Sequence, residues 1–249
     1  MKQSGNTILI TGGGSGIGEA LARRFHDRGN TVIVAGRRQE ALDNAIKGRP
    51  NMHAMTFDAD SAEGIADFAR RVIAAYPALN VLINNAGIMR YEALDKARDL
   101  SDAEATITTN LLGPIRLSNA LVEHLSAQPD AVIVNVTSGL AFVPLVIAPT
   151  YNATKAALHS YTISMREALR GKVEVIELVP PAVRTGLTPR QRDNPMYLPL
   201  DAFADEVMEL FSRQPTPPEI LVQRVSLQRF AEAENRFDAT LAKVNAPVP

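Results

Sequence analysis

The sequence predicts an α/β protein with a doubly wound parallel sheet of seven strands and helices on both faces. Three observations support this prediction. Short runs rich in β-branched residues alternate with longer helical patterns along the 249 residues, an order typical of right-handed strand–helix–strand units. Most of these runs are almost continuously apolar, as strands buried on both faces are. A glycine-rich turn joins the first run to the first helical pattern.

The predicted elements follow one another with short connections. The strands are predicted at residues 7–11, 31–35, 52–57, 80–84, 131–137, 173–179 and 219–223. The helical patterns between them cover residues 16–28, 39–47, 62–76, 102–128, 152–170 and 201–213. Because these elements use most of the chain, we expect a single domain over residues 1–249.

Two segments lie outside this alternation. Residues 180–199 are rich in proline and arginine and carry no regular pattern, so we expect a mobile substrate loop at 180–200. Residues 224–249 are predicted as a C-terminal helix and tail, with an apolar stripe that suits a core or a subunit face. The stripe consists of Val225, Phe230, Phe237 and Leu241.

Composition excludes several classes of protein. The formal net charge is -1, so no overall field attracts nucleic acid or an acidic membrane surface. The sequence has no cysteine, which excludes disulfides, thiolate metal sites and cysteine nucleophiles, and its four histidines lack metal-ligand spacing. No apolar run is long enough to span a bilayer, and the first residues do not match a signal peptide. We therefore expect a cytoplasmic protein without a metal, nucleic-acid or membrane partner.

The glycine-rich turn lies directly after the first predicted strand and opens the first predicted helix. Glycines there permit a tight turn and a close approach of a pyrophosphate to the helix N-terminus. A plain structural turn is the alternative, but the strand before and the helix after favour a Rossmann-type dinucleotide site. The cofactor residues expected in this turn are Gly12, Ser15, Gly16, Ile17 and Gly18.

The end of the second predicted strand indicates which dinucleotide is bound. A carboxylate at this position holds the ribose 2′-hydroxyl of NAD, whereas arginine accommodates the 2′-phosphate of NADP. Here Arg37 and Arg38 follow the strand and no acid is present. We expect NADP, with NAD less favoured; the alternative is that both arginines are merely solvated.

Tyr151 and Lys155 are four residues apart in a predicted helix, about one turn. A phenol has a pKa of about 10, and a nearby ammonium group lowers it toward the range useful for acid–base catalysis. Such a pair also occurs by chance in an ordinary amphipathic helix. Ser138, at the end of the fifth predicted strand, adds a hydroxyl that can contact a substrate oxygen.

These motifs together resemble the classical short-chain dehydrogenase/reductase family, from Thr7 to about Thr185. Within it, residues 84–87, 139–144 and 177–181 resemble the oxidoreductases associated with D-alanyl lipoteichoic acid operons. The motifs arrive in the family's order: the glycine turn, Asp58 with Ala59, Asn84 to Gly87, Asn110, Ser138, Tyr151 and Lys155.

The resemblance implies roles for the catalytic residues. Tyr151 would exchange a proton with the substrate oxygen, and Ser138 would donate a hydrogen bond to it. Lys155 would lower the pKa of Tyr151 and contact the nicotinamide ribose. Asn110 would lie at a helix irregularity, near Pro114, and hold a water that relays protons to Lys155.

The resemblance also extends the cofactor site. The further residues implied are Asp58, Ala59, Asn85, Ala86, Gly87, Pro181, Val183 and Thr185. Two positions depart from the family. Pro181 stands where a glycine is usual, and Ser15 stands where NADP-dependent members often carry a basic residue. The 2′-phosphate is therefore left to Arg37 and Arg38.

We expect a small carbonyl or alcohol substrate against an apolar wall that includes Met89, Leu140 and Phe142. The resemblance implies a homodimer or homotetramer, paired through the helices at 102–128 and 152–170. Two other functions stay open. A non-catalytic NADP-binding redox sensor would tend to lose the Tyr–Lys pair, and a sugar epimerase or dehydratase of the extended type would need a larger C-terminal domain.

Overall fold

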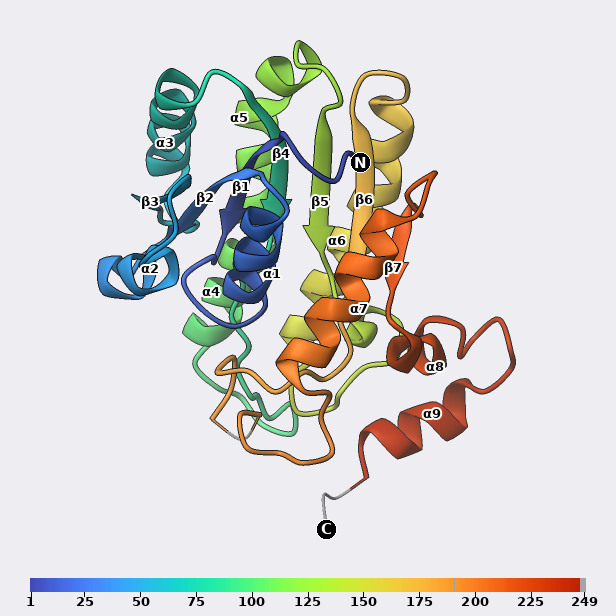
Figure 1. Cartoon of the computed structure of the whole chain (residues 1–249). Helices are drawn as coiled ribbons and strands as arrows, with labels where there is room; N and C mark the ends of the chain where they lie inside the picture. The colour runs from blue at the N-terminus through green and yellow to red at the C-terminus, as the bar shows by residue number, and fades with distance from the viewer. Residues whose placement is uncertain (190, 247–249) are drawn as a thin grey trace.

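The computed structural model describes residues 1–189 and 191–246. Within them a parallel sheet of seven strands has the order β3-β2-β1-β4-β5-β6-β7 (Figure 1). The strands are β1 (Thr7–Thr11), β2 (Thr31–Gly36), β3 (Met52–Thr56), β4 (Leu79–Asn84), β5 (Val132–Val136), β6 (Glu174–Val179) and β7 (Glu219–Leu221). The predicted fold class is confirmed. The chain changes direction across the sheet between β1 and β4, where ligands bind beyond the carboxyl ends of such strands.

Helices cover both faces of the sheet (Figure 1). One face carries α1 (Gly16–Asp27), α2 (Gln39–Ile46) and α7 (Leu200–Ser212). The other carries α3 (Ala62–Ala75), α5 (Gly113–Ser126) and α6 (Pro149–Ala168). Two apolar cores result, one on each side of the strands.

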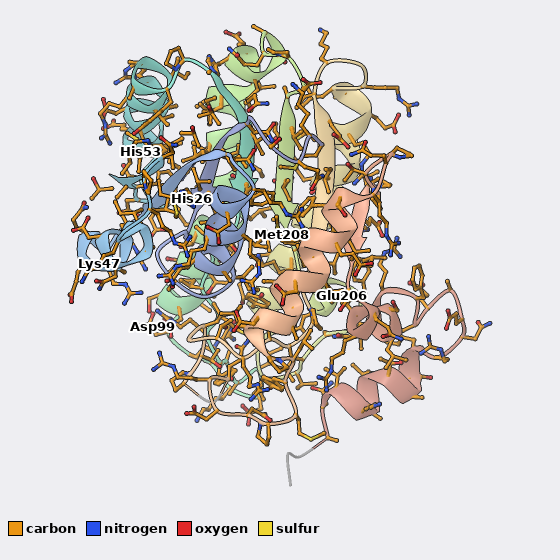
Figure 2. All side chains as sticks on the ribbon, viewed as in Figure 1. His26, Lys47, His53, Asp99, Glu206 and Met208 are labelled. Atoms are coloured by element: carbon orange, nitrogen blue, oxygen red, sulfur yellow. The ribbon has the colours of Figure 1, made fainter. Side chains whose placement is uncertain are left out.

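The alternation of side chains along β1 explains both cores. Ile8 and Ile10 pack against the α1 and α7 side, and Leu9 packs against the α3 and α5 side; all three are fully buried. On α7, Met208 is buried in the first core, whereas Glu206 accepts a hydrogen bond from the Gln223 N–H at 2.6 Å (Figure 2). The strands are thus buried on both faces of the sheet, as their continuous apolar runs predicted.

The helix predicted at 102–128 is interrupted. It consists of α4 (Ser101–Ile107), the π-helix η1 (Thr108–Leu112) and α5. Pro114 has no N–H and so cannot donate to the Asn110 carbonyl, the bond that a regular α-helix requires there. The expected irregularity at Asn110 is therefore a π-helical segment.

The C-terminal segment is divided instead of forming one helix. It contains the 3-10 turn η3 (Gln223–Val225), α8 (Ser226–Arg229) and α9 (Phe237–Val244). Asn235 has a left-handed backbone, with φ of 54°, in the turn that separates α8 from α9. Of the predicted stripe, Val225 is buried and Phe230 is 36% exposed. The last residues of the predicted tail, 247–249, lie outside the described part.

Candidate active site

The glycine turn connects β1 to α1 at the carboxyl edge of the sheet, as predicted. Gly12 and Gly16 have φ of 67° and 56°, the left-handed region that favours glycine. A Cβ on Gly18 would lie 2.4 Å from the Gly12 carbonyl oxygen and 2.5 Å from Asn85 Nδ2. Gly12 and Gly16 are therefore favoured by their backbone conformation, and Gly18 by its close packing. The backbone of the turn consequently has no side chains at these three positions that could keep a ligand away.

Thr11 holds the turn to the segment after β4, a role that sequence reasoning missed. Its Oγ1 accepts hydrogen bonds from the Asn85 N–H at 3.0 Å and the Ala86 N–H at 3.1 Å. Asn85 Nδ2 donates to the Thr11 carbonyl at 2.9 Å. Two predicted cofactor segments are thereby fixed side by side. The hydroxyl at the last position of β1 was the feature of the sequence that could have indicated this role.

The arginines predicted for the 2′-phosphate lie at the end of β2. Both Arg37 and Arg38 are exposed. Arg37 Nη1 lies 3.7 Å from Asp60 Oδ2, and Asp58 Oδ1 accepts a hydrogen bond from the Asp60 N–H at 3.1 Å. The adjacent Ala59 is buried. Arg37 and Arg38 thus follow β2, and the Asp58–Ala59 segment follows the neighbouring strand β3.

Tyr151 and Lys155 share the inner face of α6 and are 7% and 4% exposed. Lys155 Nζ lies 5.6 Å from the centre of the Tyr151 ring and donates a hydrogen bond to the Val136 carbonyl at 2.8 Å. Ser138 follows β5, and its Oγ accepts a hydrogen bond from the Leu140 N–H at 3.1 Å. The structure therefore brings three of the four predicted catalytic residues to one place.

Burial moves the pKa values of the pair in opposite directions. Burial raises the pKa of Tyr151 to about 12, and the nearby Ser138 hydroxyl acts weakly in the other direction. Burial lowers the pKa of Lys155 to about 8. The expectation that Lys155 lowers the pKa of Tyr151 does not hold in this state, because loss of solvation outweighs other influences. Tyr151 is consequently a protonated phenol at neutral pH.

Asn110 anchors the segment that follows Gly87. Its Oδ1 accepts a hydrogen bond from the Ile88 N–H, and its Nδ2 donates to the Ile88 carbonyl, both at 2.8 Å. A Cβ on Gly87 would lie 3.2 Å from Asn110 Oδ1 and 3.8 Å from Lys155 Nζ. Asn110, Gly87 and Lys155 are therefore direct neighbours, while the water relay at Asn110 stays a prediction.

The segment after β6 reaches the same site. Thr185 lies over the glycine turn, since a Cβ on Gly16 would be 3.5 Å from Thr185 Cβ. Val183 is buried and pairs in a parallel bridge with Leu198, and Pro181 is half-buried. Of the predicted loop, residue 190 lies outside the described residues.

The wall beside Tyr151 is apolar. Met89 and Leu140, both predicted there, pack in one cluster with Tyr151 and Ala148. The cluster also contains Leu145 and Leu187, which no sequence motif indicated. The prediction was wrong for Phe142, which packs against the core on the α1 and α7 side and contacts His159 edge-on, with ring centres 4.8 Å apart.

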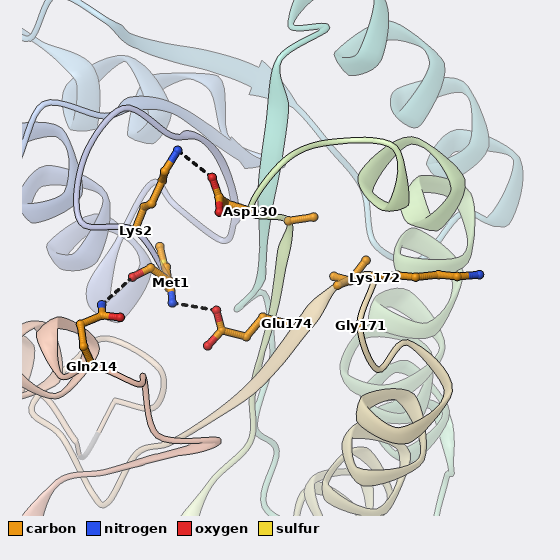
Figure 3. A pocket seen from close by; sticks show the side chains of 9 residues that line it. Met1, Lys2, Asp130, Gly171, Lys172, Glu174 and Gln214 are labelled. Carbon is orange, nitrogen blue, oxygen red and sulfur yellow. Dashed lines mark hydrogen bonds and ion pairs between the residues drawn. The ribbon is translucent and has the colours of Figure 1, made fainter.

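A large surface hollow lies at the opposite, amino-terminal edge of the sheet (Figure 3). Its lining is joined by ion pairs between Met1 and Glu174, at 2.7 Å, and between Lys2 and Asp130, at 2.6 Å. It contains none of the predicted site residues. Ligands of doubly wound sheets bind at the carboxyl edge, so the cluster around Tyr151 is the candidate active site.

Comparison with known proteins agrees with this geometry. The family described as short chain dehydrogenase matches residues 6–195. The chain is 44% identical to "Uncharacterized oxidoreductase DltE" of Bacillus subtilis (strain 168), over 78% of this chain and 77% of that protein. It is similar to the closed form of serine dehydrogenase complexed with NADP+, with 26% identity, TM-score 0.75 and coverage of 85% and 90%. It is also similar to 3-ketoacyl-(acyl-carrier-protein) reductase from Brucella melitensis complexed with NADH, with 26% identity, TM-score 0.78 and coverage of 88% and 96%.

Proposed function

The chain belongs to the short-chain dehydrogenase family of oxidoreductases, and from this we propose that it transfers hydride between NADP(H) and a carbonyl or secondary alcohol. The observation that carries the proposal is the convergence of Ser138, Tyr151 and Lys155, with Lys155 next to Gly87 of the predicted cofactor site. Helix α6 supplies the phenol and the ammonium group, and the end of β5 supplies the hydroxyl.

Each residue then has a distinct task in carbonyl reduction. NADPH, when bound, supplies the hydride. Tyr151, a protonated phenol at neutral pH, donates its proton to the carbonyl oxygen as negative charge develops there. Ser138 donates a hydrogen bond to the same oxygen. Lys155, fixed by the Val136 carbonyl, provides positive charge beside the phenol.

The residues present fit NADP. A Cβ on Gly18 would overlap the Gly12 carbonyl oxygen and Asn85 Nδ2, so glycine keeps the turn tight and its backbone free of side chains. Arg37 and Arg38 are exposed after β2, the strand next to β1, and offer the donors that a 2′-phosphate requires. Arg37 approaches Asp60 only to 3.7 Å, so its guanidinium retains donors for a phosphate.

The apolar wall favours a medium-sized, largely apolar substrate. Met89, Leu140, Leu145 and Leu187 surround the Tyr151 ring. Removing an apolar substrate surface from water against such side chains contributes about 25 cal/mol per Å2. A charged substrate would gain nothing from this surface.

The test is the consumption of NADPH and of NADH with a matched series of neutral and acidic ketones and aldehydes. We expect NADPH to be preferred and neutral, apolar ketones to react fastest. Equal turnover of acidic and neutral members would contradict the apolar site. Tight NADPH binding without turnover of any member would favour the non-catalytic redox sensor instead.

Cofactor choice is predicted to depend on the two arginines. Replacing Arg38, or Arg37, by alanine removes a charge-assisted hydrogen bond, which raises the Kd for NADPH by about 10- to 100-fold. Binding of NADH changes little, because NADH has no 2′-phosphate. Fluorescence titration with both cofactors measures this, with Arg70→Ala on α3 as the matched control. An equal loss of NADH and NADPH binding would contradict the assignment.

A further inference from the structure

Glu177 is a carboxylate in the interior that the proposed mechanism does not use. It lies in β6 between apolar neighbours, and it is fully buried. A charged carboxylate is almost never fully buried without partners, since removing it from water is costly. Its partners therefore indicate why it is there.

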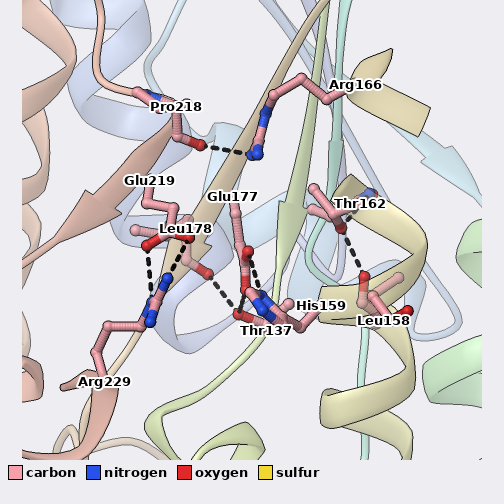
Figure 4. Close-up of polar contacts among 12 residues, drawn as sticks. Thr137, Leu158, His159, Thr162, Arg166, Glu177, Leu178, Pro218, Glu219 and Arg229 are labelled. Carbon is pink, nitrogen blue, oxygen red and sulfur yellow. Dashed lines mark hydrogen bonds and ion pairs between the residues drawn. The ribbon is translucent and has the colours of Figure 1, made fainter. Parts of the chain in front are cut away.

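The two oxygens of Glu177 bind two different segments (Figure 4). Thr137 Oγ1 donates a hydrogen bond to Oε1 at 2.6 Å. His159 Nδ1 lies 2.8 Å from Oε2, where it donates the second bond. The carboxylate thus joins the end of β5 to α6.

These two segments carry the proposed catalytic residues. Thr137 directly precedes Ser138, and its backbone N–H donates to the Leu178 carbonyl at 2.9 Å. His159 is four residues after Lys155 and eight after Tyr151, about one and two helical turns along α6. A single carboxylate therefore links the strand end that holds the serine hydroxyl to the helix that holds the phenol.

The charged groups nearby are already paired with other partners. Arg229 on α8 donates two hydrogen bonds to Glu219, at 2.8 and 2.9 Å, and lies 4.8 Å from the centre of the Phe142 ring. Arg166 on α6 donates to the carbonyls of Val175 and Pro218. His159 is consequently the side chain of α6 that donates a hydrogen bond to Glu177. His159, Glu177 and Glu219 also lie close enough to ligate one cation, but Glu219 is already paired with Arg229.

We propose that Glu177 is a positioning residue that sets the separation between the Ser138 and Tyr151 hydroxyls through Thr137 and His159. The inference rests on the proposed roles of Ser138 and Tyr151. Both hydroxyls must contact one substrate oxygen, so a small change in their separation lowers turnover. A displacement of about 1 Å in an active site can reduce the rate about 100-fold.

Thr137 offers the sharpest test, because valine keeps its shape and removes its hydroxyl while serine keeps the hydroxyl. We expect kcat of Thr137→Val to fall by at least about tenfold, with KM for NADPH unchanged, and Thr137→Ser to retain kcat within about twofold. Thr106→Val is the control: within the described residues, its buried hydroxyl donates to the Asp102 carbonyl of its own helix, at 2.7 Å. We expect Thr106→Val to lower stability without lowering kcat.

Crystal structures of the Thr137 variants provide a readout that needs no turnover. The distance between Ser138 Oγ and Tyr151 Oη should widen in Thr137→Val and stay unchanged in Thr137→Ser. An unchanged distance together with an unchanged kcat in Thr137→Val would overturn the inference. A widened distance in a protein that reduces no carbonyl would support the positioning role and reject the proposed function.

Discussion

Burial shifts the pKa of Tyr151 and that of Lys155 toward the uncharged form of each side chain. Burial raises the pKa of the phenol to about 12 and lowers that of the ammonium group to about 8. The sequence spacing predicted that the two side chains share a helix face, which the structure confirms. It did not predict the direction of the Tyr151 pKa, because the depth of burial depends on segments such as 138–148 that fold over α6.

Lys155 makes stability depend on pH in the cofactor-free protein. Its pKa is 10.5 when unperturbed and about 8 in the folded state, so between these values the unfolded chain binds more protons. The contribution of Lys155 to the free energy of unfolding therefore rises as the pH is raised from 8 toward 10. Above pH 10 the raised pKa of Tyr151 acts in the opposite direction, because the folded chain then holds the extra proton.

We predict that the wild type gains about 2 kcal/mol of unfolding free energy relative to Lys155→Met between pH 8 and pH 10. Methionine has a similar length and does not titrate. Urea unfolding of both proteins at pH 8, 9 and 10, without cofactor, measures the difference. A constant difference across these pH values would show that Lys155 is not destabilised by burial.

At the scale of the elements, the predicted strands and most predicted helices agree with the structure to within a few residues. The exceptions are the C-terminal helix, which is divided into α8 and α9, and the helix at 102–128, whose apolar pattern continues through the π-helix η1. Pro114 marked the irregularity but not its type. The contact of Asn110 with Ile88 depends on β4 and η1 being neighbours, which a one-dimensional pattern does not contain.

The start of α1 is predicted to tolerate no side chain at Gly18. A Cβ there would lie 2.4 Å from the Gly12 carbonyl, so Gly18→Ala displaces the turn and costs about 1–3 kcal/mol of stability. NADPH affinity should fall as well, because the displaced backbone forms the expected phosphate site. Thermal unfolding and fluorescence titration measure both effects.

Gly36→Ala is the control for this substitution. A Cβ on Gly36 would meet only Leu42 Cδ2, at an ordinary 3.6 Å, so stability should change by less than about 0.5 kcal/mol. If Gly18→Ala were equally harmless, the turn would not be as closely packed as the structure indicates.

For the whole molecule, the alternation of elements predicted a parallel sheet but not the order of its strands. That order depends on which side each connection crosses, and it makes β1, β4 and β5 consecutive, so that their carboxyl ends lie side by side. The predicted site residues could therefore be selected from motifs, whereas Thr11, Leu145 and Leu187 became visible only in three dimensions. No helix among residues 1–189 and 191–246 is long and apolar enough to cross a bilayer.

A substitution on the outer face of α6 tests the predicted homodimer or homotetramer. This face carries small residues, and both Ala153 and Ser160 are exposed, so a partner helix can approach closely. We predict that Ala153→Arg shifts the protein from the wild-type oligomer to the monomer, as measured by light scattering at micromolar concentration. Ala74→Arg on α3 is the control and should keep the wild-type mass. A monomeric wild type would contradict the pairing.

The most direct measurement of the central claim is the rate of NADPH oxidation by Tyr151→Phe with a ketone that the wild type reduces, together with its Kd for NADPH. Phenylalanine fills the same buried space and lacks only the hydroxyl. We predict that turnover falls by about 1000-fold or more, because the proton donor is lost, while the Kd changes by less than about twofold. Turnover close to that of the wild type would contradict the assignment of Tyr151 as the proton donor.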